Sequence, residues 1–384
     1  MKINKKNMIN TGIISFGVKC PIIRNGDNLE EIVISCTKSS LDELGFNFED
    51  GDIIGITESV VARSRGNYVT VDDIVQFMEE EGYSKDLVLY FPIMSRNRFS
   101  MILKAFSRYA NHIKMFVHLG TDEVGNPVYG KNPFTGIDIQ DYYIQLAKSE
   151  DCELDIVCFD LLSNYPSKRD DCTYINCMCH PAQFESRYGK LELNLSSILN
   201  RPVKRKDGSM SGFNTEFGLL GSNKANEETL KLFPEPKDAR ELVDCISRVI
   251  YERYGKRVHV LVYGDGCFKS PSYGLGTSIW EFADPVTCPA ASQELYDMKP
   301  NELKLKAFAD DKYKSLSGEE LTAAIKEEIS HKDSTLVGNM ASQGTTPRKL
   351  LDLLASTFDL ISGSGDQGCP VVYMKNRFKN FASK

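Results

Sequence analysis

The sequence has 384 residues, of which 41% are hydrophobic and 26% are charged, as in globular proteins with a substantial core. A net charge of −7 and a pI near 5.5 argue against a general nucleic-acid-binding protein, because no overall basic field attracts phosphate. Eleven cysteines without the spacing of a disulfide scaffold favour a reducing compartment.

Neither the start of the chain nor its hydropathy pattern predicts export or membrane insertion. Residues 1–10 contain lysines and asparagines but no apolar core, so we predict no secretory signal. No run of about 18 apolar residues occurs, so we predict no membrane span. We therefore expect a cytoplasmic protein with no nucleic-acid or membrane partner.

Short runs rich in Val, Ile, Leu, Tyr and Phe predict strands along the whole chain. They are Glu31–Cys36, Asp52–Thr57, Leu87–Phe91, Ile113–His118, Leu154–Asp160, Val258–Tyr263 and Val371–Met374. Helical patterns lie between several of them. These helices are predicted from Leu29 with Asp27 as cap, after Ser95, before Gly255, from Ser317 with a capping box to Glu320, and from Pro347. Strands mixed with helices indicate an α/β or α+β layered fold.

Two stretches are less regular. Residues 164–236 are rich in Ser, Asn, Gly, Lys and Pro, which is typical of a long insertion that carries short elements. Residues 301–384 read as a mainly helical extension. We therefore predict one domain over 1–300, with the insertion inside it, and a helical C-terminal extension over 301–384.

The run Val258–Tyr263 halts on an acidic turn, Gly264-Asp265-Gly266-Cys267-Phe268-Lys269. Glycines let the backbone turn at the carboxyl end of a strand, where open α/β sheets bind ligands. Asp265 could hold a divalent cation there, Lys269 could contact phosphate, and Asp284 could complete a two-carboxylate metal site. The alternative is that Asp-Gly simply makes a hairpin turn.

A second candidate site is the stretch Gly51–Gly66, which predicts a strand, a polar turn and a short helix that carries Arg63. Hydroxyl and backbone N–H groups at such a turn bind anions, and arginine binds phosphate through two hydrogen bonds. The alternative is an ordinary strand–helix junction with Thr57 as its N-cap.

Other polar segments are typical of structure as much as of function. Ser95-Arg96-Asn97-Arg98 opens a helix with a basic face, which could receive an anion or face solvent. Asp138 and Asp141 follow a turn-rich loop, for which a solvated turn is favoured over a metal site.

The start of the chain resembles the coenzyme F-420 gamma-glutamyl ligases. Their pattern "I-x-x-G-D-D-L-x-x-I" is similar to Ile23–Ile32, and "G-D-(apolar)4-(S/T/Q)-x-x-V-S-K-A-E-G-R" is similar to Gly51–Asn67, with Arg63 in the place of the lysine. Their metal-binding "S-D-T-x-G-R" resembles the segment around Asp265, although its neighbours differ. Their "A-D-E-L-A" is similar to Asn301-Glu302-Leu303-Lys304, which nominates Glu302.

This resemblance implies a CofE-like mixed-sheet fold with helices packed on the sheets, and a homodimer. It also implies GTP, or another nucleoside triphosphate, bound by Val18, Lys19, Cys20, Pro21, Glu58 and Arg63. Together with the acidic pattern above, it predicts that Asp265 holds Mg²⁺ or Mn²⁺ with either Asp284 or Glu302, and that Asp265 and Lys269 are catalytic residues.

We therefore predict a ligase that joins a substrate carboxylate to L-glutamate through an acyl phosphate. No protein nucleophile is needed, because the enzyme positions the reactants and neutralises charge. Two alternatives stay open. One is a nucleotide- or metabolite-binding protein that keeps the fold without ligation, and the other is a gamma-glutamyl ligase for a different acceptor, such as a folate-like acid.

Overall fold

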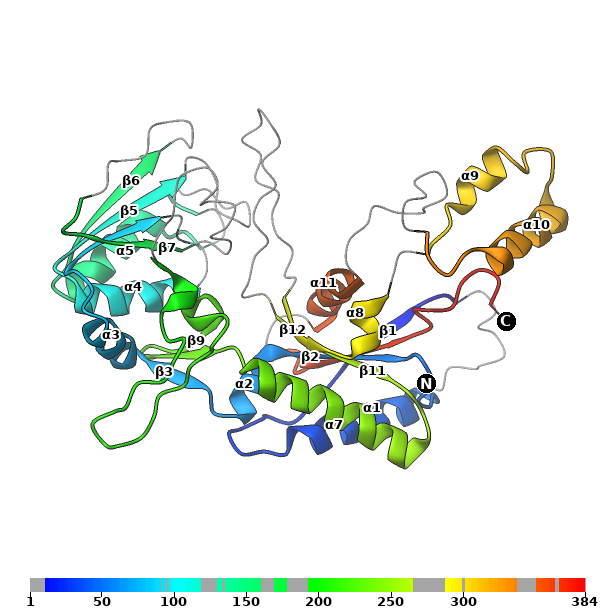
Figure 1. Cartoon of the computed structure of the whole chain (residues 1–384), viewed down its shortest axis with the longest axis horizontal. Coiled ribbons are helices and arrows are strands. Elements are labelled where there is room, and N and C mark those ends of the chain that lie inside the picture. The colour runs from blue at the N-terminus through cyan, green and yellow to red at the C-terminus, as the bar shows by residue number, and fades with distance from the viewer. Residues whose placement is uncertain are drawn as a thin grey trace.

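The computed structural model describes residues 11–90, 92, 94, 97–118, 130–132, 135–159, 169–177, 193–264, 287–298, 301–336, 350–362 and 366–383. Figure 1 shows two α/β lobes and a helical arm that projects from one of them. We call residues 68–232 the second lobe and residues 301–336 the arm, and the remaining described residues the first lobe.

The first lobe is built on a five-stranded sheet in the order β1-β13-β2-β11-β12. Its strands are β1 (Ile14–Val18), β2 (Ile53–Thr57), β11 (His259–Gly264), β12 (Thr287–Ala291) and β13 (Val371–Lys375). Strands β2 and β11 pair in parallel, whereas β13 runs antiparallel to both β1 and β2. Since β1 and β2 both oppose β13, the carboxyl ends of β1, β2 and β11 lie at one edge of the sheet.

Helices cover both faces of this sheet. Alternate residues of the strands point to opposite faces, so Ile54, Ile56, Val260 and Val262 belong to the core under α1 (Leu29–Leu44) and α7 (Pro236–Tyr254). On the other face, Ile53, Leu261 and Tyr263 pack with α8 (Gln293–Asp297) and α11 (Leu350–Ser362). The runs of apolar residues in β2 and β11 follow from this double burial.

The strand predicted over Glu31–Cys36 is wrong, because these residues lie within helix α1. The buried side chains of this helix recur at the spacing of a helical stripe; they are Leu29, Val33, Ile34, Thr37 and Leu41. The helix does begin at Leu29 as predicted, but the Asn28 side chain caps it by accepting from the backbone N–H of Glu31. Asp27 instead accepts from the backbone N–H of Arg24 at 2.7 Å.

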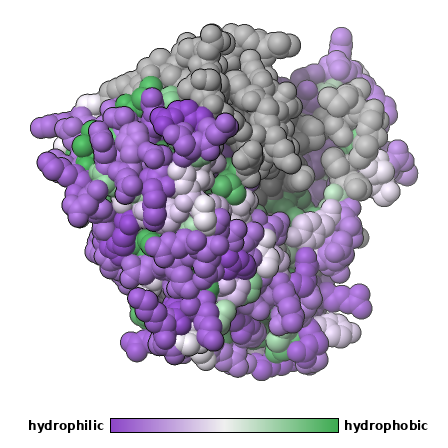
Figure 2. Space-filling view, turned by 60° about the vertical axis from the view of Figure 1, so that its left-hand side comes forward, coloured by the Kyte–Doolittle hydropathy of each residue, from purple (hydrophilic) through white to green (hydrophobic). Residues whose placement is uncertain are grey.

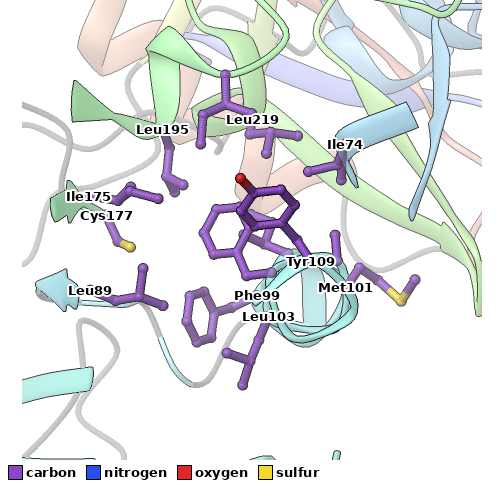
Figure 3. Close-up of a cluster of buried hydrophobic side chains, with 14 of the residues drawn as sticks. Ile74, Leu89, Phe99, Met101, Leu103, Tyr109, Ile175, Cys177, Leu195 and Leu219 are labelled. Atoms are coloured by element: carbon purple, nitrogen blue, oxygen red, sulfur yellow. The ribbon is translucent and has the colours of Figure 1, made fainter. Parts of the chain in front are cut away.

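The second lobe contains a parallel sheet in the order β6-β5-β4-β7-β8. Its strands are β4 (Asp86–Tyr90), β5 (His112–His118), β6 (Glu153–Phe159), β7 (Thr173–Asn176) and β8 (Leu193–Asn194). Counted from β4, this is the 3-2-1-4-5 order of doubly wound folds. Figure 3 shows the core of this lobe, where Phe99, Leu103 and Tyr109 of α4 meet side chains such as Leu89 and Leu219.

Helices α3 (Val71–Glu80), α4 (Asn97–Tyr109) and α5 (Ile139–Ser149) contribute to this core. A small sheet in the order β3-β10-β9 lies where the second lobe meets the first (Figure 1). It consists of β3 (Tyr68–Thr70), β9 (Ser222–Asn226) and β10 (Thr229–Leu232). The segment predicted as an insertion, 164–236, therefore supplies β7 and β8 to one sheet and β9 and β10 to the other.

The end of the chain combines helices with a strand of the first lobe. The arm holds α9 (Leu305–Asp310) and α10 (Gly318–His331), which begins after Ser317 as predicted but without the capping-box hydrogen bond. Strand β13 then enters the sheet between β1 and β2. The division at residue 301 stays a prediction, to which the structure adds that both parts contribute strands to the first-lobe sheet.

The mixed α/β fold predicted from the sequence is confirmed. Among the residues that the structure describes, no helix combines the length and apolar character needed to cross a membrane. Figure 2 shows a mainly hydrophilic face with hydrophobic side chains scattered over it, in keeping with the charged composition.

Candidate functional site

The candidate site is the edge of the first-lobe sheet where β1, β2 and β11 end, which we call the carboxyl edge. Thr57 and Tyr263, near the ends of β2 and β11, are paired in register, and the backbone N–H of Thr57 donates to Pro370 just before β13. Ligands of open α/β sheets bind outside the carboxyl ends of parallel strands. Three of the segments predicted from the sequence begin here: the loop 18–21, the turn at Glu58, and the turn after Gly264.

Glu58 is a buried carboxylate at this edge. It opens helix α2 (Glu58–Ser64) directly after β2, and it is only 2% exposed. Its Oε1 atom accepts a hydrogen bond from Nδ2 of Asn223 in the second lobe, at 2.7 Å. A side-chain amide from β9 therefore fixes the Glu58 carboxylate at the junction of the two lobes.

Gly264 ends β11 against the same carboxylate side chain. A Cβ atom on Gly264 would lie 2.4 Å from Cγ of Glu58 and 3.4 Å from the ring of Phe233. Such a contact is too short for any side chain, so the glycine allows β11 and α2 to approach each other. The backbone of β11 thereby passes directly beside Glu58 before the chain continues to Asp265.

Lys231 also reaches this junction from the second lobe. It lies in β10 between Leu230 and Leu232, which are both buried in the second-lobe core. The lysine, on the opposite face of the strand, is 8% exposed and its Nζ donates to Oγ of Ser59, beside Glu58. Sequence reasoning missed Lys231 and Asn223, although the alternation Leu-Lys-Leu is the signal of a strand with a polar second face.

The predicted nucleotide loop follows β1 at the carboxyl edge. Val18 is buried in the sheet, whereas Lys19 and Pro21 are exposed. The backbone N–H of Cys20 donates to the carbonyl of Gly368 at 3.1 Å, which ties this loop to the segment before β13. Burial raises the pKa of the Cys20 thiol, and the neighbouring thiols of Cys36 and Cys369 raise it further, so Cys20 is a neutral thiol and no nucleophile.

Arg63 lies in the last turn of α2 and is exposed. Five residues of helix place its side chain about 140° around the axis from Glu58. Nearby, the backbone N–H of Gly26 donates to the carbonyl of Ser64 at 2.9 Å, so the end of α2 contacts the turn 24–27. The structure therefore does not bring Arg63 and Glu58 onto one face of α2.

Glu302 lies at the opposite edge of the sheet. Its Oε1 accepts from Nη2 of Arg377 at 3.2 Å, and Arg377 follows the carboxyl end of β13. Because β13 opposes β2, with Met374 beside Ile53, this end of β13 is at the amino end of β2. A five-residue strand separates the two edges by about 17 Å, so Glu302 is far from Gly264.

The structure does not describe Asp265 and Lys269 of the predicted acidic turn, nor Asp284, the predicted second carboxylate. Within the part of the chain that is described, no group of three or more His, Cys, Asp or Glu side chains is arranged to hold a metal ion.

Two other polar candidates have structural roles. Arg98 is buried and donates to the backbone carbonyls of Leu220 and Ser222, which fixes the segment that leads into β9. Asp138 caps α5 by accepting from the backbone N–H groups of Gln140 and Asp141. Ser95 and Arg96 lie outside the described residues.

Comparison with known proteins gives one family. The family model described as F420-0:Gamma-glutamyl ligase matches residues 17–376. This range begins one residue before Val18, contains the whole second lobe, and ends one residue after β13. Among curated proteins, none matches the chain.

Proposed function

Because this chain belongs to the F420-0:gamma-glutamyl ligase family, we propose that it is a GTP- and divalent-metal-dependent ligase. The reaction joins a carboxylate of a small-molecule acid to the amine of L-glutamate. The observation that carries this proposal is the family match over residues 17–376, which includes every segment at the carboxyl edge. The convergence of loop 18–21, Glu58 and Gly264 at that edge supports one shared site.

The proposed chemistry has two steps. An oxygen of the substrate carboxylate attacks the γ-phosphorus of GTP, which forms an acyl phosphate and releases GDP. The glutamate amine then attacks the acyl carbon, the C–O bond to phosphate breaks, and the amine loses a proton as the amide and inorganic phosphate form. No covalent bond to the protein is required, so the chain has to bind and orient the three substrates and exclude water.

The described residues supply surfaces for that task. The backbone and side chains of Val18, Lys19, Cys20 and Pro21 lie at the end of β1, where we propose that they contact the nucleotide. Glu58 is held rigidly by Asn223 and by close packing against Gly264. A carboxylate fixed in this way is suited to accept hydrogen bonds from the nucleotide or the glutamate amine.

Cations complete the proposed site. A divalent ion bound with the triphosphate would neutralise charge on the phosphate oxygens. Asp265 and Asp284 are its proposed ligands and Lys269 is a proposed phosphate contact, all three from the sequence pattern. Glu302 would have to leave Arg377 and the opposite edge to join them. Arg63 lies in the last turn of α2 and on a different face of that helix from Glu58. It would therefore contact a phosphate group from a different direction than Glu58 does.

The direct test of this function is phosphate release from GTP with Mn²⁺ present. We expect release only when both L-glutamate and a deazaflavin acceptor acid are added, because each step needs its own substrate. GTP binding without any phosphate release, over a panel of acceptor acids, would instead favour a binding protein that has lost ligation. Phosphate release with L-glutamate and a folate-like acid, but not with L-glutamate and the deazaflavin acid, would identify a ligase for a different acceptor.

The metal assignment has its own test in the variant Asp265→Asn. The neutral amide removes a negative charge but preserves the shape of the side chain, so metal-dependent GTP binding measured by calorimetry should weaken about tenfold or more. Unchanged binding would show that Asp265 does not hold the metal. The proposed homodimer is checked separately by light scattering.

A further inference from the structure

We propose that Lys231 of the second lobe is a phosphate-binding residue of the ligase site. This inference rests on the proposed function, since it assigns a further contact to the same nucleotide. It also gives the second lobe a direct role in the site, because the ammonium group would reach the ligand from outside the first-lobe sheet.

The strand geometry directs Lys231 toward α2. In the small sheet, Lys231 is paired in register with Asn223 on one side and with Tyr68 on the other. Residues paired in this way share one face of a sheet. Since Leu230 and Leu232 occupy the opposite face within the second-lobe core, the row of Tyr68, Lys231 and Asn223 faces away from that core.

The hydrogen bonds show what this row meets. Lys231 Nζ contacts Ser59 Oγ, and Asn223 Nδ2 contacts Glu58 Oε1, so neighbouring residues of the row hold neighbouring residues of α2. Both contacts join the second lobe to the first turn after β2. The contact with Ser59 places the ammonium group beside the first turn of α2, which begins at the carboxyl edge.

The burial of Lys231 strengthens the attraction between its ammonium group and a phosphate group. Lysine is rarely as buried as it is here, at 8% exposure, because its ammonium group is strongly hydrated. In surroundings of low dielectric constant, a fixed positive charge attracts a polyphosphate much more strongly than it does in water. An ammonium group that contacts Ser59, next to Glu58 in the first turn of α2, is therefore placed to bind a phosphate group at the carboxyl edge.

Arg63 and Lys231 differ in their position relative to the first turn of α2. It is the cationic residue of the α2 segment that the sequence pattern nominates, yet it is exposed and lies in the last turn of the helix. Lys231 is distant in sequence but contacts the first turn. The second lobe, through Lys231, thus supplies a cation at the first turn of α2, which Arg63 in the last turn does not face.

The test is calorimetric titration of Lys231→Met, Lys231→Arg and the wild type with GTP and with guanosine, in the presence of Mg²⁺. A lysine that binds phosphate contributes to the affinity for the triphosphate but not to that for the nucleoside. We therefore expect Lys231→Met to weaken GTP binding about 10- to 100-fold and to leave guanosine binding within about twofold. Lys231→Arg, which keeps the charge, should retain more of the GTP affinity than Lys231→Met.

A matched control is Lys224→Met, on the other face of β9. Lys224 pairs with Glu227 at 2.7 Å, so its removal should leave both affinities unchanged. Equal losses for GTP and guanosine in Lys231→Met would show a structural role and overturn the inference, as would GTP binding at the wild-type level. If the wild type binds neither GTP nor ATP, the proposed function itself fails, and the inference falls with it.

Discussion

Gly264 is a residue at which β11 and Glu58 approach each other closely. The variant Gly264→Ala would place a methyl group 2.4 Å from Cγ of a buried side chain that cannot move into solvent. We expect a loss of about 1–3 kcal/mol in the free energy of unfolding, because overpacking forces neighbouring groups apart. Urea unfolding monitored by circular dichroism measures this change.

The control for that variant is Gly12→Ala, where an added Cβ atom meets nothing within 4 Å. It should leave the free energy of unfolding within about 0.5 kcal/mol of the wild type. Equal stability of the two variants would contradict the close approach of β11 and α2.

A buried charged network holds the opposite edge of the same sheet. Asp52 Oδ2 accepts from Lys375 Nζ at 2.8 Å and also from the hydroxyl of Tyr373, and all three residues are buried. Burial raises the pKa of the Asp52 carboxyl, although the hydrogen bonds from Lys375 and Tyr373 oppose this effect. Burial has the larger effect, so Lys375 and Tyr373 offset only part of the free-energy cost of keeping the Asp52 carboxylate in the core.

We expect Lys375→Met to lower the free energy of unfolding by about 3–5 kcal/mol at neutral pH, because it leaves the Asp52 carboxylate buried without its cation. The pKa of Asp52, already raised in the folded state, should rise further. A raised folded-state pKa means that stability is lost as the pH rises through it. The loss should therefore shrink as the pH falls and Asp52 takes up a proton.

Urea unfolding of Lys375→Met at neutral and at mildly acidic pH checks both the size and the sign of this effect. Lys379→Met is the control, because Lys379 is half exposed and only approaches Glu49 at 3.6 Å. A loss that grows on acidification would refute the account of the network.

At the element scale, Asp73 joins the start of helix α3 to the segment around Arg205. It completes a capping box with Thr70 and receives two hydrogen bonds from Arg205, at 2.8 and 2.7 Å. Burial opposes its charge, but the hydrogen bonds from Arg205 and Thr70 outweigh burial and lower the pKa of Asp73. Stability from Asp73 is thus present above the unfolded pKa and is lost as the pH falls through the folded value.

Asp73→Asn should cost about 1.5–3 kcal/mol at neutral pH, since it replaces charge-assisted hydrogen bonds with neutral ones. The neighbouring variant Asp72→Asn removes a carboxylate that is 80% exposed and pairs with Arg108, so it should cost less than about 1 kcal/mol. Thermal and urea unfolding compare the two. Equal effects of the two variants would mean that the Arg205 contact adds no stability.

Elements could be predicted from the sequence wherever burial imposes a simple pattern. The apolar runs at β2, β4, β5, β11 and β13 are largely buried within sheets, so their composition indicates strands. The run Glu31–Cys36 has a similar composition, but it is part of a longer stripe of buried residues at helical spacing that extends to Leu41. This longer stripe favours a helix, and the run lies within α1. Short runs alone do not separate these two cases.

The site could be predicted only where its residues follow a strand in sequence. Glu58 and the loop 18–21 come directly after β2 and β1, so a local pattern finds them. Asn223 and Lys231 come from a segment whose polar composition indicated an insertion. Their place beside α2 depends on how the small sheet packs, and tertiary contacts of this kind leave no local pattern.

At the scale of the whole molecule, the chain passes twice between the lobes, at residues 64–68 and 232–236. The side chain of Asn67 ties these crossings together, because its Nδ2 donates to the carbonyls of Phe213 and Phe233 at 2.9 and 2.7 Å. The lobes are thus joined by two adjacent connecting segments, residues 64–68 and 232–236, and by the contacts of Lys231 and Asn223 with α2. A ligand at the carboxyl edge would touch this junction.

We therefore expect GTP with Mg²⁺ to slow backbone hydrogen exchange in residues 57–64 of the first lobe and in residues 222–232 of the second. Residues 318–331 of the arm should exchange at the same rate with and without the nucleotide, and serve as the internal control. Hydrogen exchange detected by mass spectrometry measures all three segments. Protection limited to the first lobe would contradict a site shared between the lobes.

Amide formation is the defining reaction of the proposed ligase, and mass spectrometry of the acceptor detects it directly. The protein is incubated with GTP, Mn²⁺, isotopically labelled L-glutamate and a deazaflavin acceptor acid. We predict an acceptor heavier by one labelled glutamyl residue, with one GDP and one phosphate formed for each amide bond. An acceptor of unchanged mass, after incubation with protein that binds GTP, would contradict the assignment of this chain as a ligase.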